Sequence, residues 1–416
     1  MKGCYIPAKQ FKLRNSLLAG VGFLELANAG DFAANVWNQI PVPRYAIALM
    51  AIGGTVALGI STYAFKDALL SWRNVVNLRE ERHHLQTQKI TGSPNGQMVR
   101  CLNSLLDVNF REKGTELVDR VSMDLFMGFG AIAVGVGTLI AIDGADRRVW
   151  HASNLLSGYI GNAPCALYGI ANLAWSAYVW RRALRHKASG ANELKGTDVG
   201  EMLKRRTDTV KFHAMLNGIT GVIAGAASLV TATMWWGYLV LAPCIVISIL
   251  CNYLWRHRIG YDRPFVRQSF SMDETSLVKE LQFVHSTQRI FEENPSDSLS
   301  KLVSDPGSIT SVIDFITKND LFEDLCVRVL KDAKLSATLF VPLNETIIID
   351  PQSLLAADDR SISSLLGIAR TCVREVGPMR FKYRERYLIE ALGCYLCNSE
   401  VENTTEKAGE DSSQGE

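Results

Sequence analysis

Four ionisable side chains lie within or at the edge of long apolar stretches of this 416-residue sequence: Glu25, Asp31, Asp124 and His213. An ionisable group inside a membrane helix raises the insertion free energy by about 2.5–3.5 kcal/mol, so such groups commonly serve a function. Glu25 is the first candidate because it lies near the middle of its stretch. We expect these side chains to form structural hydrogen bonds between helices, with Asp124 and His213 at the wet boundary of their spans, and the alternative is a polar lumen that binds or passes a solute.

The apolar stretches that surround these residues have the length of membrane spans. Crossing a bilayer requires roughly 20 mostly apolar residues, and five stretches meet this length at 45–65, 121–142, 155–180, 212–233 and 238–255. A sixth stretch, at about 16–36, is interrupted by Glu25 and Asp31. The sequence therefore predicts an all-α membrane protein with about six transmembrane helices, arranged as three hairpins of two spans.

The basic residues indicate the orientation of these spans. Residues 1–14, 66–120, 181–211 and 256–267 carry 4, 9, 9 and 4 Lys and Arg residues, which makes 26, whereas the three short connections carry only Arg44, Arg147 and Arg148. Basic loops remain on the cytosolic side of membranes. Six spans with both termini in the cytosol fit this distribution, whereas five would place the termini on opposite sides.

A motif occurs twice inside apolar stretches, as GYIGNAPC at 158–165 and as GYLVLAPC at 237–244. This internal repeat supports the hairpin description of the second and third pairs of spans. Pro164 and Pro243 are predicted to kink their helices, because proline cannot donate to the carbonyl four residues earlier. The alternative is that each proline lies in a first helical turn. Trp72, Trp180 and Trp255 each precede an arginine and are predicted to be anchors at the membrane interface.

The charge of the chain changes near residue 267. Residues 1–267 hold 29 Lys and Arg against 17 Asp and Glu, and residues 268–416 hold 15 against 25. We expect a basic cytosolic N-terminus (1–14), three transmembrane pairs (15–65, 121–180, 212–256), cytosolic loops (66–120, 181–211), a cytosolic domain (268–400) and a disordered acidic tail (401–416). The cytosolic domain is predicted to be mainly helical, with a small β-hairpin at 338–341 and 346–349.

Motifs of known chemistry are absent from the sequence. The chain has no Walker loop, no GxSxG, no HExxH, no kinase motifs and no dinucleotide-binding fingerprint. Cys394 and Cys397 form a single CxxC, which is interpreted as two thiols in a helical core. We therefore expect no enzymatic activity, no cofactor, no metal site and no nucleic-acid partner.

Residues 41–82, PVPRYAIALMAIGGTVALGISTYAFKDALLSWRNVVNLREER, carry one resemblance. This stretch, and above all its WRNVVNLREER run, resembles uncharacterised multi-pass integral membrane proteins of filamentous fungi. The resemblance implies a location in a membrane and no activity or site residues.

Two functions are predicted from these features. The first is a non-enzymatic scaffold or membrane-organising protein, which sits in the lipid bilayer and binds a protein partner through its cytosolic C-terminal domain. The alternative is a small-solute or proton-coupled transporter that uses Glu25 and the neighbouring polar groups.

Overall fold

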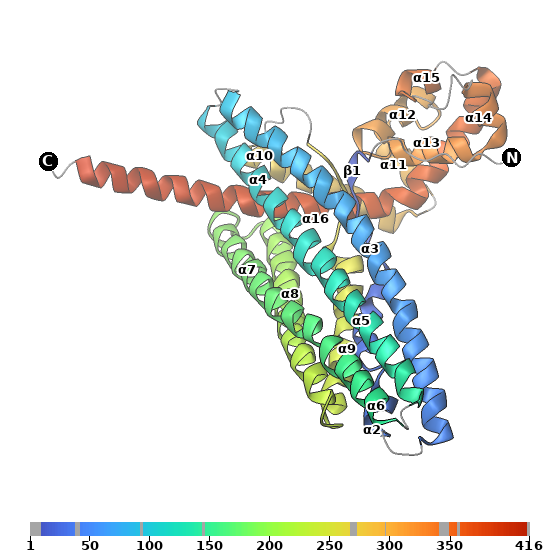
Figure 1. The fold of residues 1–416 in the computed structure, drawn as a ribbon. Helices are drawn as coiled ribbons and strands as arrows, with labels where there is room; N and C mark the ends of the chain where they lie inside the picture. Colours follow the sequence, from blue (N-terminus) through green and yellow to red (C-terminus); the bar gives the residue numbers. More distant parts are fainter. Residues whose placement is uncertain are drawn as a thin grey trace. The chain divides into compact units, whose positions relative to one another are not determined.

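The computed structural model describes residues 10–37, 42–91, 95–143, 146–266, 273–295, 297–340, 349–355 and 358–413. Nearly all of them are helical (Figure 1), which confirms the predicted all-α class. The chain divides into two compact units. Unit 1 comprises Met1–Leu13, Tyr261–Phe265 and Met272–Ile389, and unit 2 comprises Arg14–Gly260, Val266–Ser271 and Glu390–Glu416.

Unit 2 is a bundle of long helices that run alongside one another (Figure 1). In addition to α-helices it contains two 3-10 segments, η1 and η3, and three π-helical segments, η2, η4 and η5. Its elements are η1 (Ala19–Phe23), α1 (Leu24–Asn28), α2 (Phe32–Val36), α3 (Arg44–Thr91), α4 (Gly96–Thr115), η2 (Glu116–Ser122), α5 (Met123–Ile140), η3 (Ala141–Asp143), α6 (Arg147–Asn154), η4 (Leu155–Ile160), α7 (Ala163–Glu193), α8 (Asp198–Thr231), α9 (Gly237–Leu254) and η5 (Trp255–Ile259).

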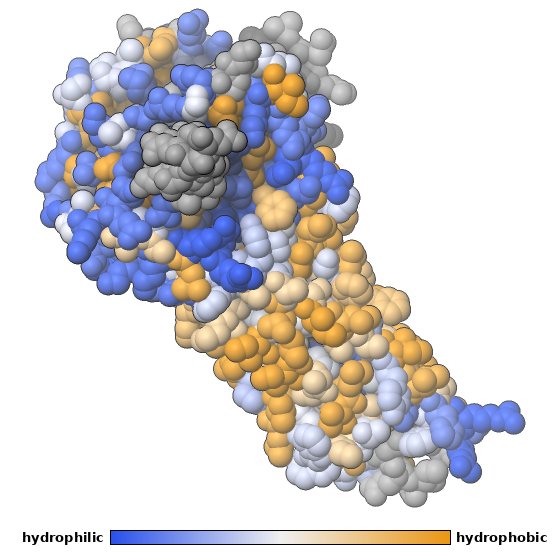
Figure 2. Space-filling model, turned by 90° about the vertical axis from the view of Figure 1, so that its left-hand side faces the viewer, coloured by the Kyte–Doolittle hydropathy of each residue, from blue (hydrophilic) through white to orange (hydrophobic). Residues whose placement is uncertain are grey.

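Four helical stretches in the described part of the chain are long and apolar enough to cross a membrane: Arg44–Thr91, Gly96–Asp143, Asp198–Thr231 and Gly237–Ile259. Large apolar side chains on the outside of unit 2 are exposed, for example Ile52, Ile170 and Val246. Figure 2 shows hydrophobic side chains gathered over much of the lower part of the visible face, with some polar ones among them. Exposed apolar surface of this extent is typical of a protein that contacts lipid.

The apolar stretch at 16–36 is not one helix. It is divided into η1, α1 and α2, yet it runs antiparallel to α3, because Gly20 lies against Tyr63 and Ala33 packs with Ala46. At a rise of 1.5 Å per residue, these contacts extend over about 25 Å of α3. The broken segment therefore follows α3 over most of the thickness of a bilayer core.

Direct backbone packing accompanies the break between α1 and α2. A Cβ atom on Gly53 would lie 2.3 Å from the carbonyl oxygen of Gly30, so a side chain at Gly53 requires the two backbones to separate. Backbone groups at membrane depth need partners inside the protein. The N–H of Gly30 donates to Ala27 and that of Phe32 to Ala29, at 3.0 and 3.1 Å.

The two copies of the repeated motif adopt different local structures. Pro164 lies in the first turn of α7, so the predicted kink inside a helix is wrong there. The helical path breaks just before it, and the side-chain amide of Asn162 donates to the carbonyl of Gly158 at 3.0 Å. Pro243, in contrast, lies inside α9, as expected.

The backbones of helices α7 and α8 pack directly against each other. A Cβ atom on Gly169 would lie 2.4 Å from the carbonyl oxygen of Gly221, and one on Gly225 would lie 2.7 Å from the Cα atom of Ala166. Small residues allow helix backbones to pack directly and are common at helix contacts in membranes.

Unit 1 contains a two-stranded antiparallel sheet and a group of helices. In the sheet, Lys12 pairs with Pro264 and Leu13 with Arg263. Apolar side chains from α10, α12, α13 and α16 form a fully buried core that includes Leu281, Ile316 and Phe381. The elements of unit 1 are β1 (Lys12–Leu13), β2 (Arg263–Pro264), α10 (Glu274–Glu293), α11 (Ser298–Leu302), α12 (Ile309–Lys318), α13 (Phe322–Lys331), α14 (Ala333–Leu339), α15 (Pro351–Leu355) and the part of α16 (Asp359–Ser413) up to Ile389.

Two boundaries differ from the sequence-based expectation. Thr338 and Leu339 belong to α14 and not to a strand, and the rest of the predicted hairpin, at 341–348, lies outside the described residues. The predicted domain 268–400 does not end at 400, because the division between the units falls inside α16, after Ile389. Helix α16 continues to Ser413, into the segment for which the composition predicts disorder.

Candidate functional site

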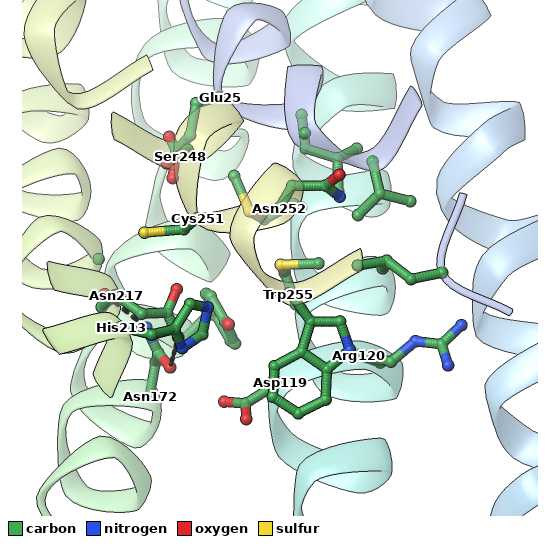
Figure 3. A pocket seen from close by; sticks show the side chains of 18 residues that line it. Glu25, Asp119, Arg120, Asn172, His213, Asn217, Ser248, Cys251, Asn252 and Trp255 are labelled. Carbon is green, nitrogen blue, oxygen red and sulfur yellow. Dashed lines mark hydrogen bonds between the residues drawn. The ribbon is translucent and has the colours of Figure 1, made fainter. Parts of the chain in front are cut away.

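A cavity of about 80 Å³ lies inside unit 2 (Figure 3). It is lined by side chains from η1, α1, η2, α5, α7, α8, α9 and η5. Several of them are polar and converge on the cavity from different helices: Glu25, Asp119, Arg120, Asn172, His213, Asn217, Ser248 and Asn252. A cavity of this volume holds several water molecules or a small ion, because one water molecule needs about 10–15 Å³ of cavity volume.

Glu25 is placed at this cavity by the short helix α1. Its side chain is buried, with 8% of its surface exposed, and it accepts a hydrogen bond from Asn28 Nδ2 at 3.1 Å. The helix breaks after α1, so the polar residues that follow this break lie at the start of or within a separate helix, α2.

His213 and a pair of asparagines line the cavity from α7 and α8. Asn172 and Asn217 bind each other reciprocally: Asn217 Nδ2 donates to Asn172 Oδ1, and Asn172 Nδ2 donates to the Asn217 carbonyl, both at 2.9 Å. The His213 ring lies 5.6 Å from the ring of Trp255, centroid to centroid. Trp255 therefore forms part of the cavity wall, and its role as an interface anchor stays a prediction.

Trp72 and Trp180, the other two predicted anchors, are 43% and 41% exposed. Tyr238, the tyrosine of the second copy of the repeated motif, is buried. Its hydroxyl donates to Asp31 at 2.7 Å, and Asn35 Nδ2 donates to the other Asp31 oxygen at 2.9 Å. Asp31 thus has a donor on each oxygen and is not among the residues that line the cavity.

Asp119 is a second carboxyl group at the cavity, and the sequence analysis placed it in a cytosolic loop. The indole nitrogen of Trp175 donates to its Oδ2 at 3.1 Å, while its buried Oδ1 has no hydrogen-bond partner. The π-helical segment η2 carries Asp119 and Arg120 into the bundle.

Asp124 does not line the cavity and belongs to a buried charge cluster beside it. Arg120 donates to Asp67 at 3.0 Å and to Glu116 at 2.9 Å, and the carboxyl group of Asp124 lies beside that of Asp67. Asp67, Glu116 and Arg120 were missed because the predicted loop 66–120 includes them. The spacing of Glu116, Arg120 and Asp124, four residues each, is a signal that would have placed them on one helical face.

A second buried charge cluster, outside the apolar part of unit 2, joins α4, α7 and the distal part of α16. Glu390 accepts from Arg111 Nε at 2.7 Å and from Arg182 Nη1 at 2.9 Å. Burial alone raises the pKa of Glu390, but the two guanidinium groups outweigh it and hold that pKa well below its usual range. Burial, together with the Arg182 charge, lowers the pKa of the nearby His186 ring to about 3.

The CxxC of α16 lies in this cluster. Cys394 accepts from Arg182 at 2.7 Å, and Cys397 lies 3.3 Å from the hydroxyl of Ser189. Burial raises the pKa of the Cys394 thiol to about 12, so it remains protonated at neutral pH. Among the described residues, no group of three or more His, Cys, Asp or Glu is arranged to hold a metal ion.

Comparison of the chain with protein-family models, with curated proteins and with solved structures finds no match. The class of the protein therefore follows from its own features: in its described residues it is a predominantly helical protein with four helices of membrane-spanning length, and its helical bundle contains a cavity lined in part by polar side chains. The resemblance of residues 41–82 to fungal membrane proteins stays a prediction.

Proposed function

We propose that unit 2 transports a small solute or protons across a membrane, with the polar cavity as the binding site. The observation that carries this proposal is the convergence of Glu25, Asp119 and His213 on one cavity, which is lined in part by helices long and apolar enough to cross a bilayer. Intramembrane ionisable groups that face a cavity are typical of substrate and proton pathways. Two carboxyl groups and several amide oxygens favour a small cationic or hydrogen-bonding solute.

The proposal includes six spans with both termini in the cytosol. In addition to the four apolar helices, the segment 16–36 follows α3, and α7 packs antiparallel to α8 from Gly190 near Leu203 to Ala166 near Gly225. Both chain segments extend along helices that are long enough to cross a bilayer. Six passes also leave 26 of the 29 basic residues counted above on one side.

Transport is tested with the full-length protein in vesicles, with a pH-sensitive dye inside and an imposed membrane potential or a gradient of small amines outside. We expect the variant Glu25→Gln to lose flux, because the amide cannot exchange a proton or neutralise a cation. The matched control is Glu193→Gln, which makes the same change at an exposed position. Absence of flux in the unchanged protein, or equal flux in Glu25→Gln, contradicts the proposal.

A second candidate function is a scaffold that recruits a protein partner through unit 1. The observation that favours it is that unit 1 has a buried core of its own, formed around Leu281, Ile316 and Phe381. In this case Glu25→Gln leaves the cellular function intact, whereas removal of residues 268–416 abolishes it. The truncation also removes residues 390–400, which pack within unit 2. The control is therefore Glu390→Arg, which undocks these residues without removing unit 1. An equal loss of cellular function in Glu390→Arg contradicts the scaffold.

A further inference from the structure

The buried charge cluster next to the cavity has more carboxyl groups than its cation can pair. Asp67, Glu116 and Asp124 share one arginine, Arg120, and all four side chains are buried, with 0%, 7%, 0% and 2% of their surface exposed. Removing an isolated charge from water is strongly unfavourable, so buried charges are normally paired or neutralised by protonation.

The hydrogen bonds show which carboxyl groups are paired. Glu116 accepts from Arg120 at 2.9 Å and from the Ser71 hydroxyl at 2.6 Å. Asp67 accepts from Arg120 at 3.0 Å and from the backbone N–H of Leu18 at 2.8 Å. The guanidinium group of Arg120 is therefore committed to two carboxylates.

Asp124 is left without a donor. Both of its carboxyl oxygens are buried and have no hydrogen-bond partner. The groups that face it are Asp67 from α3, Arg120 and Glu116 from η2, and Tyr168 from α7. A deprotonated pair of carboxylates cannot form a hydrogen bond, whereas one proton between them creates a donor and removes one buried negative charge.

We infer that Asp124 and Asp67 together hold one proton, with Asp124 as the carboxylic acid and Asp67 as the acceptor. Arg120 fixes the charge of Asp67 and also lines the cavity, so the proton is held directly beside the proposed transport site. The proton would serve as the coupling ion of that site. This coupling role rests on the proposed function, but the presence of the proton does not.

The inference is tested by infrared spectroscopy of the purified full-length protein in detergent at neutral pH, in light and heavy water. We expect a carbonyl band of a protonated carboxylic acid that shifts in heavy water, and we expect its intensity to fall in Asp124→Asn. Asp143→Asn, at an exposed carboxylate, is the matched control and should leave the band unchanged.

An infrared band of equal intensity in Asp124→Asn overturns the inference. If that variant does not fold, Asp67→Asn gives the same test, because it removes the acceptor of the shared proton and should also lower the band. The measurement needs no substrate and no flux, so the absence of transport in vesicles leaves its result intact.

Discussion

At the scale of single residues, the buried aspartates of unit 2 differ in whether their carboxyl oxygens have hydrogen-bond partners. Asp31 has donors from Tyr238 and Asn35, and its carboxylate is accounted for by these contacts. Asp119 and Asp124 each retain buried oxygens without a partner. Burying an acceptor without a donor costs about 1–3 kcal/mol of folding stability. We therefore expect a proton, an ion or a solute to satisfy these oxygens in the folded protein.

Glu390 allows a prediction at the same scale. Its pKa is lowered in the folded protein, so its contribution to stability is complete above its unfolded value of 4.5 and is lost as the pH falls below that value. His186, whose pKa falls from 6.5 to about 3, acts in the same direction between these two values, because the unfolded state binds the proton more tightly.

We therefore expect acidification from pH 7 to pH 4 to undock residues 390–400, measured by hydrogen exchange of their amides. Glu390→Gln should lower the docking stability at pH 7 by about 3–5 kcal/mol, since it leaves two buried arginines without their carboxylate. Its pH dependence below 4.5 should be flatter than that of the unchanged protein. The measured rate of each amide is divided into its intrinsic rate at the same pH, and protection factors that do not change with pH in the unchanged protein would refute this account.

At the scale of elements, interruptions of regular helices place the site. The break between α1 and α2 leaves Glu25 on α1 and places Asp31 just before α2, and the π-helical segment η2 precedes α5 and presents Asp119 and Arg120 at the cavity. Segments of π-helix are frequent at functional sites because the extra residue per turn changes the direction of the side chains.

The contact between α7 and α8 gives a prediction about packing. In Gly169→Ala the new methyl group meets the carbonyl of Gly221 at 2.4 Å, so the helices must separate. We expect a loss of about 1–3 kcal/mol, typical of overpacking, seen as a lower melting temperature in detergent. Gly59→Ala on α3 is the control, because no atom lies within 4 Å of the added carbon. Equal melting temperatures of the two variants would count against the close contact.

At the scale of the whole molecule, the division into two units assigns different tasks to different parts of the chain. Unit 2 holds the apolar helices, the cavity and both buried charge clusters, and unit 1 has its own core. The two are continuous through α16, whose last part, from Glu390, belongs to unit 2.

The proposed six spans predict the position of both termini. Tags at the two ends should be digested together by protease added to the cytosolic side of sealed membranes, and both should be protected when protease is added to the opposite side. An odd number of spans, with the segment 16–36 not crossing, would expose one tag on each side.

The helical class and the stretches that are long and apolar enough to cross a membrane follow from the sequence alone. Apolar runs of span length and their interruption by charged loops depend only on local composition, since burying apolar surface is the dominant driving force. Of the four candidate residues, Glu25 and His213 do meet at one cavity, and Asp124 lies beside it.

Only the tertiary structure decided which polar groups pair and which remain unpaired. Asp67 and Asp124 are distant in sequence, and a charge-rich stretch such as 66–120 is read as solvated unless its neighbours in space are known. The same limit applies to Tyr238, whose hydroxyl donates to Asp31, and to Trp255, which lines the cavity beside His213. Hydrogen bonds between helices depend on the register of packing, and local composition does not fix that register.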